Sequence, residues 1–398
     1  MLVSLLLKGI GKNSTEVRSV LETFVELGAP PAILVQGKPH LGTDRMVHLL
    51  RQAHSKLVAL GVEVRYNTKV TSLVAKGPGG RVSGVVLRSS DGNAATAVDE
   101  GVYALEDCEA VLLAVGHSAR DLYETLHAQG DVALSFQPFS AGLRAEHPQA
   151  LINELQYGPK LAELAGWKQP LPAADYKLVA SGLRTRYSST RDFSHASSLL
   201  PRDRTRGRGE GKGESEDDES GEAAQFTKGP TAAYSFCMCP GGQVVPTAME
   251  PDYLCVNGMS YSKRSSPFAN SGLVVPISLA DCLPFVSGAP SASFSGDDGL
   301  DPTSSAAVLA GLAFQRAVER SASLMGGGNL VAPVQSIGDF LAEKPLTSSA
   351  TSAEAPLSSS YRLGVKRAPL QDLYPPQVKA VLLLYIYIYF PFKRCHFQ

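Results

Sequence analysis

The chain has 398 residues, with 37 basic and 38 acidic side chains and a net charge of −1. This balance excludes the overall basic excess that marks a dedicated nucleic-acid-binding protein, and the six cysteines are too few and too unevenly spaced for a disulfide framework. The length suits two or three domains of about 100–200 residues each, in a soluble protein of a reducing compartment.

The N-terminal region predicts two amphipathic helices. Met1–Leu7 is apolar but has no basic front, so we expect no secretory signal peptide. A helix from Asn13 ends at Gly28, and its apolar stripe consists of Val17, Val20, Leu21, Phe24 and Leu27. A second helix runs from Thr43 to Gly61, and its inward side chains are expected to be Met46, Val47, Leu50, Leu57 and Val58.

A small antiparallel meander is expected next. Its strands are Val62–Tyr66, Val70–Ala75 and Val82–Arg88, with Gly79-Gly80 at a hairpin tip. The continuous apolar run Ala110–Val115 then predicts a strand buried on both faces. It ends at Gly116, and Ser118 with Asp121 resembles a capping arrangement. Such a strand end is a ligand position in open α/β sheets, although many purely structural turns have the same pattern.

From Phe139 onward, short β-like segments replace the helices. They are Ser140–Glu146, Tyr176–Ala180, Ala233–Met238, Gln243–Thr247 and Tyr253–Asn257. Helical periodicity returns at Ala306–Met325, with Leu309, Leu312, Ala313, Ala317 and Leu324 on one face. The pattern predicts an α/β (α+β) fold in which a β-rich insertion splits an α/β part.

Three segments have the composition of insertions or linkers. Arg184–Glu222 sorts its charges into an arginine-rich front and an acidic back, and it lacks the apolar content that ordering requires. We interpret it as a disordered insertion, either a self-neutralising loop or an arm that contacts nucleic acid or protein. Ser287–Ser305 and Thr347–Ser360 are rich in small residues and are expected to be linkers or surface insertions.

The C-terminal segment Val378–Phe392 is nearly all apolar. It is shorter than the ~18–20 residues of a spanning helix, so no membrane span is predicted. Its Tyr385–Tyr389 part is β-prone and uncharged, which is typical of an aggregation hazard.

Candidate chemistry lies in three places. Lys38, His40 and Arg45 form a cationic helix entry that suits an anionic ligand or is simply exposed. Cys237 and Cys239 form a Cys-x-Cys pair that is redox-active, contributes to a metal site or is inert. No second Cys/His pair stands at zinc spacing, so no metal site is predicted. Asn257–Arg264 and Phe268–Gly272 have the hydrogen-bonding density of a binding loop, or of a solvated hairpin.

Six peptides in order resemble the FAD-dependent, NAD(FAD)-utilising dehydrogenase-like flavoproteins. They are Gly28–Arg45, Ala110–Asp121, Gln137–Tyr157, Tyr234–Gly242, Val256–Gly272 and Gly326–Leu341. The resemblance covers about 9–182, 229–281 and 306–378. It implies a partial Rossmann-like FAD-binding domain (1–136), an insertion or substrate domain (137–345) containing a disordered segment (184–228), a return to the FAD-binding domain (346–378) and a non-family tail (379–398).

The resemblance also implies site residues. Val70 belongs to a strand at the adenosine end of FAD, and the strand-end motif near the cofactor consists of Ala114, Val115, Gly116 and His117. Asn257–Asn270 and Tyr234–Gly242 are expected to face the flavin from the insertion domain. The substrate candidates are Lys38, His40, Arg45, Cys237, Cys239, Asn257, Tyr261, Arg264 and Asn270. No catalytic acid, base or hydride donor is assigned.

The chain departs from the family at both ends, where we find neither the Gly-x-Gly-x-x-Gly turn that approaches the FAD pyrophosphate nor the closing glycine-rich segment. We therefore expect a fragment of an FAD-dependent oxidoreductase, with impaired FAD binding and with NAD(P)H as electron donor to an unidentified small-molecule substrate. The alternative is a non-enzymatic binding module that uses the arginine-rich insertion. The expected compartment is the cytoplasm or a plastid, and the oligomeric state is undetermined.

Overall fold

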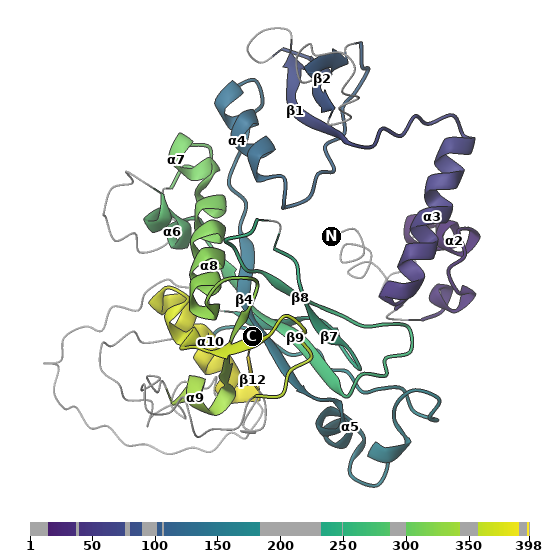
Figure 1. Cartoon of the computed structure of the whole chain (residues 1–398), viewed down its shortest axis with the longest axis vertical. Helices are drawn as coiled ribbons and strands as arrows, with labels where there is room; N and C mark the ends of the chain where they lie inside the picture. Colours follow the sequence, from purple (N-terminus) through teal and green to yellow (C-terminus); the bar gives the residue numbers. More distant parts are fainter. Residues whose placement is uncertain are drawn as a thin grey trace, which may run out of the picture.

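The computed structural model describes residues 15–36, 40–75, 80–89, 102–105, 107–183, 232–248, 250–286, 300–342, 357–389 and 396–397. It mixes helices and sheets, which confirms the expected α+β class. Figure 1 shows the N-terminal helices at one side, a small sheet with a helix beside it at the top, and a large sheet flanked by helices below. Among the described strands, one pair is parallel, so the Rossmann-like sheet stays a prediction.

The two N-terminal helices form as predicted, but the second buries a different face. Helices α2 (Thr15–Glu26) and α3 (Thr43–Ala59) flank the 3-10 turn η1 (Pro31–Leu34). Their shared core holds Leu21, Leu27 and Leu49. The expectation for α3 was wrong, because Val47, Leu50, Leu57 and Val58 are all exposed. Apolar side chains occupy both sides of α3, so periodicity alone could not identify the side that α2 covers.

A three-stranded antiparallel sheet follows. It consists of β1 (Thr68–Ala75), β2 (Val82–Ser89) and β3 (Val102–Leu105) in that order. Leu73 of β1 packs with Leu122 and Leu126 of helix α4 (Arg120–Gln129). The hairpin is confirmed, whereas the expected strand Val62–Tyr66 does not form.

The expected buried strand at Ala110–Val115 was also wrong. The segment belongs to no strand, and Leu112 is 90% exposed. A strand buried on both faces needs a neighbour on each edge, and the described residues supply none here. The predicted cap is absent too: Ala119 is the N-cap of α4 without a side-chain hydrogen bond, and Asp121 pairs with Lys69 instead.

The main body is a seven-stranded sheet in the order β11-β10-β12-β4-β9-β6-β5. Its strands are β4 (Phe139–Pro148), β5 (Val179–Ala180), β6 (Ala233–Cys239), β9 (Phe268–Ile277), β10 (Ala332–Ser336), β11 (Val365–Arg367) and β12 (His396–Phe397). A hairpin of β7 (Gln243–Pro246) and β8 (Val256–Met259) stands beside it. The segment Phe268–Gly272, expected in a loop, begins the central strand β9. Its small and polar residues hid a strand that is buried on both faces.

The helices of the main body pack beside this sheet (Figure 1). They are α5 (Gln149–Tyr157), α6 (Leu279–Cys282), α7 (Ser305–Val308), α8 (Ala310–Gly326), α9 (Ile337–Leu341) and α10 (Pro376–Tyr389), with 3-10 turns η2 (Ala162–Leu164), η4 (Leu283–Phe285) and η5 (Leu370–Asp372). The predicted helix at Ala306–Met325 is confirmed apart from a break at Leu309. Its expected inward face is corrected, because Phe314 and Ala322 are buried while Leu324 is exposed.

Helix α10 overturns the β-prone interpretation of the C-terminal segment. Leu382, Tyr385 and Ile386 are fully buried in the main core. A segment that is apolar on all sides shows no helical period, and burial overrides its β-propensity. Across the described ranges, no helix combines the length and hydrophobicity that crossing a bilayer requires.

A buried ion pair anchors α4 to the main body. Arg120 donates to Glu319 of α8 at 2.5 Å, and both side chains are about nine-tenths buried. Arg120 also contacts Glu250 at 3.3 Å and lies over the ring of Tyr253. The expected insertions 184–228, 287–305 and 347–360 lie largely outside the described residues, as do Lys38 and the Gly79 hairpin tip.

Candidate functional site

The site is built around Arg144, a residue that the sequence analysis did not single out. It lies on β4 and is only 5% exposed. Its Nη1 donates to Asn270 Oδ1 at 2.7 Å, and its Nη2 donates to Asn257 Oδ1 at 2.8 Å. Nη1 also approaches the carbonyl of Cys237 at 3.4 Å. These residues, Arg144, Cys237, Cys239, Asn257 and Asn270, are called the Arg144 cluster below.

The guanidinium of Arg144 has neutral hydrogen-bond partners. None of the ion pairs between described residues involves it. Burial lowers the pKa of Arg144, while the neighbouring thiols of Cys239 and Cys237 oppose that shift. A buried charge without a counter-charge is costly, so the cluster favours the approach of an anionic or electron-rich group.

A second buried group in the cluster has unused hydrogen-bonding capacity. Asn270 is fully buried on β9, and its Nδ2 has no hydrogen-bond partner within the described part of the chain. Gly258 leaves little space beside it, because a Cβ there would lie 2.0 Å from Asn270 Oδ1 and 2.4 Å from Arg144 Nη1. The main chain of β8 thus reaches the guanidinium closely because residue 258 has no side chain.

The two thiols of the cluster stand at a β-bulge in β6. Phe236 pairs with Gly272, but Cys239 pairs with Asn270, so three steps on β6 face two on β9. Cys237 takes a left-handed backbone conformation, with φ of +44°. Burial raises the pKa of both thiols, whereas the Arg144 guanidinium acts in the opposite direction on each.

A tight turn follows the thiols and fixes their position. Gly241 has φ of +52°, and a Cβ there would lie 1.9 Å from the carbonyl oxygen of Arg264. The Gly241 amide donates to Gln149 Oε1 at 2.7 Å, and the Ser266 amide donates to the Gly241 carbonyl at 3.1 Å. This turn therefore brings Arg264 next to Cys239, where its charge also opposes the raised thiol pKa.

The start of α3 docks on the loop after β8. Asp44 accepts from the Ser262 amide at 2.8 Å and from its hydroxyl at 2.6 Å. The Thr43 amide donates to the Ser260 carbonyl at 3.1 Å, and His40 Nε2 lies 3.2 Å from Ser260 Oγ. The hydrogen bonds from Ser262 lower the pKa of Asp44. Residues about 220 positions apart are thus joined at one place.

His40 lies between the two parts of this junction. Burial, together with the nearby Arg264 guanidinium, lowers its pKa to about 4. The imidazole is therefore neutral at neutral pH and offers one donor and one acceptor. Tyr261, next to this junction, is exposed.

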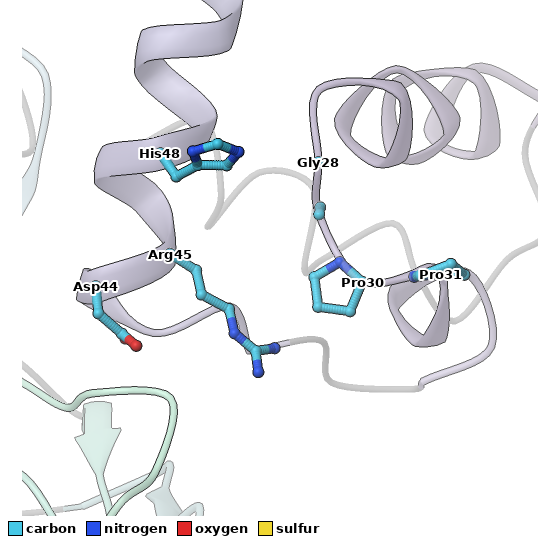
Figure 2. A pocket seen from close by; sticks show the side chains of 7 residues that line it. Gly28, Pro30, Pro31, Asp44, Arg45 and His48 are labelled. Atoms are coloured by element: carbon cyan, nitrogen blue, oxygen red, sulfur yellow. The ribbon is translucent and has the colours of Figure 1, made fainter.

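Arg45 points elsewhere. Figure 2 shows Arg45 and His48 extending from α3 towards Gly28 and Pro30, across a pocket of about 500 Å³. Arg45 and His48 are both exposed, and both lie in the N-terminal half of α3. Among the described residues, no group of three or more His, Cys, Asp or Glu side chains is placed to hold a metal ion.

The structure thus gathers most of the predicted substrate candidates, while the predicted cofactor residues stay apart from them. His40, Cys237, Cys239, Asn257, Arg264 and Asn270 converge around Arg144 and Ser260. Val70 lies on β1, and Ala114–His117 is an exposed loop before α4. Among the described residues, no hydrogen bond or ion pair joins these five to the Arg144 cluster. An arginine at a β4 position between buried apolar residues was the signal that could have revealed the cluster.

Comparison with known proteins gives two matches. A model of the family described as FAD-dependent protein, C-terminal domain-like matches residues 138–190 and 222–386, more than half of the chain. The match skips 191–221, within the expected insertion, and continues past residue 378. An uncharacterized protein of Clostridium beijerinckii is 31% identical over 382 residues. That alignment covers 94% of this chain and 54% of the relative, so the chain spans about half the relative's length.

Proposed function

Since the chain belongs to the FAD-dependent protein, C-terminal domain-like family, we propose that it is part of an FAD-dependent oxidoreductase whose Arg144 cluster faces the flavin ring. A bound FAD would supply two-electron redox chemistry, with NAD(P)H as the proposed electron donor. The family match supports the flavin, and the buried Arg144 is the structural observation that carries the assignment of the cluster.

The chemistry of the cluster fits a flavin. The polar edge of the flavin ring carries carbonyl oxygens and ring nitrogens, which accept hydrogen bonds and gain negative charge on reduction. Arg144 supplies a fixed positive charge that no carboxylate among its described partners neutralises. Asn270 Nδ2 supplies a donor without a partner in the described chain. Together they suit an acceptor-rich group that becomes anionic.

The rim of the cluster suits a substrate. Asn257 and Cys237 are exposed members of the cluster, whose Arg144 and Asn270 are buried, and Tyr261 is exposed beside the junction of His40 with Ser260. His40 beside Ser260 stays neutral, so it can accept or donate a hydrogen bond without adding charge. We place the substrate candidates among the described residues here, except for Arg45, which points into the separate pocket. Val70 remains in the proposal as a residue near the adenosine end of FAD, and Ala114–His117 remains as the glycine motif near the cofactor.

The test is a titration of the purified chain with FAD, in which binding is monitored by the quenching of flavin fluorescence. We expect binding in the micromolar range or weaker, because the sequence has no Gly-x-Gly-x-x-Gly turn for the pyrophosphate. Arg144→Met is expected to weaken binding at least about tenfold, the equivalent of one lost charged hydrogen bond. Arg18→Met, which removes an exposed arginine of α2, is the matched control. Absence of FAD binding by the native chain, or equal binding by a folded Arg144→Met variant, would refute the proposal.

A further inference from the structure

The Cys237–Cys239 pair has features that the flavin proposal does not require. The two thiols are the only described cysteines separated by a single residue, and they share one buried cation. Cys108, Cys255 and Cys282 lie singly in other segments. The alternative that this pair contributes to a metal site has no support in the described residues, where no group of three or more His, Cys, Asp or Glu side chains could hold a metal ion.

We propose that Cys237 and Cys239 are a redox-active dithiol, and that the substrate class of this site is a disulfide. The proposal deepens the proposed function, since a flavin would be the partner that restores the dithiol. Its first step, however, involves only the two thiols and the disulfide, so that step can be tested without FAD.

The β-bulge contracts β6 between Phe236 and Cys239. In a regular strand, residues i and i+2 lie about 6.6 Å apart, close to the upper limit of about 6.8 Å between the Cα atoms of a disulfide. In β6, three steps from Phe236 to Cys239 cover the length of two steps on β9. The left-handed backbone of Cys237 provides this contraction. The bulge thus shortens the Cys237-to-Cys239 separation relative to an extended strand.

The surroundings of the two thiols differ in a way that suits sequential attack. Cys237 is exposed, so an external disulfide can reach its sulfur. Cys239 is partly buried, and its Sγ lies 3.3 Å from the Cys237 carbonyl oxygen. Arg144 and Arg264 are the two cations beside the Cys239 thiol, and each opposes the rise in its pKa that burial causes. Reactive cysteines are found in such partly exposed, electropositive surroundings.

The reaction balances without a further oxidant. The Cys237 thiolate attacks one sulfur of R–S–S–R′, which forms a mixed disulfide and releases R′–SH with the proton from Cys237. The Cys239 thiolate then attacks the Cys237 sulfur, which forms the Cys237–Cys239 disulfide and releases R–SH with the second proton. The substrate disulfide is reduced by two electrons, and the two cysteines are oxidised by two electrons. Arg144 would stabilise the Cys239 thiolate during the second step.

The experiment exposes the purified full chain, without FAD, to glutathione disulfide and analyses its peptides by mass spectrometry. We expect a peptide two hydrogen masses lighter that contains a Cys237–Cys239 bond. Cys239→Ser is expected to stop at a stable glutathione adduct on Cys237, because the resolving thiol is gone. Cys237→Ser is expected to form neither product in this peptide. Cys255→Ser, which alters a cysteine outside the bulge, is the matched control and is expected to behave as the native chain.

The rate provides a second readout. We expect Arg144→Met to slow disulfide formation severalfold, because the guanidinium lowers the pKa of both thiols against the effect of burial, and Arg144→Lys to restore part of the rate. A Cys237–Cys239 bond that forms while FAD fails to bind would sustain this proposal and refute only the proposed function. No Cys237–Cys239 bond, a bond to Cys255 instead, or no adduct on Cys237 in Cys239→Ser would overturn the dithiol proposal.

Discussion

Replacing Arg120 by leucine tests how the small sheet and α4 are held to the main body. The change removes the cation that pairs with Glu319 at 2.5 Å and leaves that carboxylate in a site where its side chain is only 10% exposed. It also removes the weaker contact with the more exposed Glu250 and the position over the Tyr253 ring.

The size of the effect follows from the burial of the pair. Removing one partner of a buried ion pair costs about 3–5 kcal/mol, because the other charge is left uncompensated. Glu250 adds less than about 1 kcal/mol, since exposed pairs are weak. We expect a loss of about 4 kcal/mol in the free energy of unfolding, a large part of the about 5–15 kcal/mol of a typical domain. The double variant Arg120→Leu/Glu319→Leu is expected within about 1 kcal/mol of the native chain, because no buried charge remains.

Urea unfolding monitored by circular dichroism measures the free energy of unfolding of the native chain, the single variants Arg120→Leu and Glu319→Leu, and the double variant. The double-mutant cycle then isolates the coupling. Hydrogen exchange then locates the loss: amides of α4 should exchange faster in Arg120→Leu while those of β4 and β9 keep their protection. Arg18→Leu, which removes one member of an exposed pair in α2, is the control. A loss below about 1 kcal/mol in Arg120→Leu, or a double variant as unstable as the single one, would show that this pair is not the anchor.

Three further predictions concern stability. His40 has a folded pKa of about 4, below its usual value, so the unfolded chain binds the proton more readily and stability is lost as the pH falls from about 6.5 to 4. Because part of His40 remains in water, we expect the His40→Gln variant to lose only about 1 kcal/mol less unfolding free energy than the native chain between pH 7.5 and pH 5.0, measured by urea unfolding. An equal loss in the two proteins would contradict the low pKa. Leu382→Ala in α10 should cost about 2–5 kcal/mol, because the side chain is fully buried; a loss under about 0.5 kcal/mol would mean that the C-terminal helix is not part of the core. Leu112→Ser should change the thermal midpoint of unfolding little, because Leu112 is exposed. A decrease of several degrees would instead support the buried strand that the sequence pattern predicted.

Local signals in the sequence predicted much of the secondary structure. The apolar stripe of α2, the β1–β2 hairpin and the end of α8 at its glycine run all depend on neighbouring residues, and all three form. The ordered peptides also predicted the family, which the family match confirms. Peptide order needs no knowledge of contacts, which is why this inference succeeded where finer ones did not.

Burial was harder to predict than secondary structure. Val47 and Leu50 of α3 were expected inside and are exposed, while Leu49 is buried. The apolar run Ala110–Val115 forms no strand, and the β-prone Tyr385–Tyr389 lies in a helix. In each case the apolar residue types indicated that burial was favourable. Which of these residues are buried, and in which secondary structure, depends on the distant elements that pack against them.

The sequence by itself determined the family, the α+β class and several peptides of the candidate site, because motif order, turn residues and helical periods are local properties of a chain. Only the tertiary structure decided that Arg144 is the centre of the site. Its partners Cys237, Asn257 and Asn270 lie between 93 and 126 positions away along the chain. Strand pairing between β4, β9 and β6 brings Cys237 and Asn270 to Arg144, and the β7–β8 hairpin beside the sheet supplies Asn257. Pairing between distant strands depends on long-range contacts that no local pattern specifies.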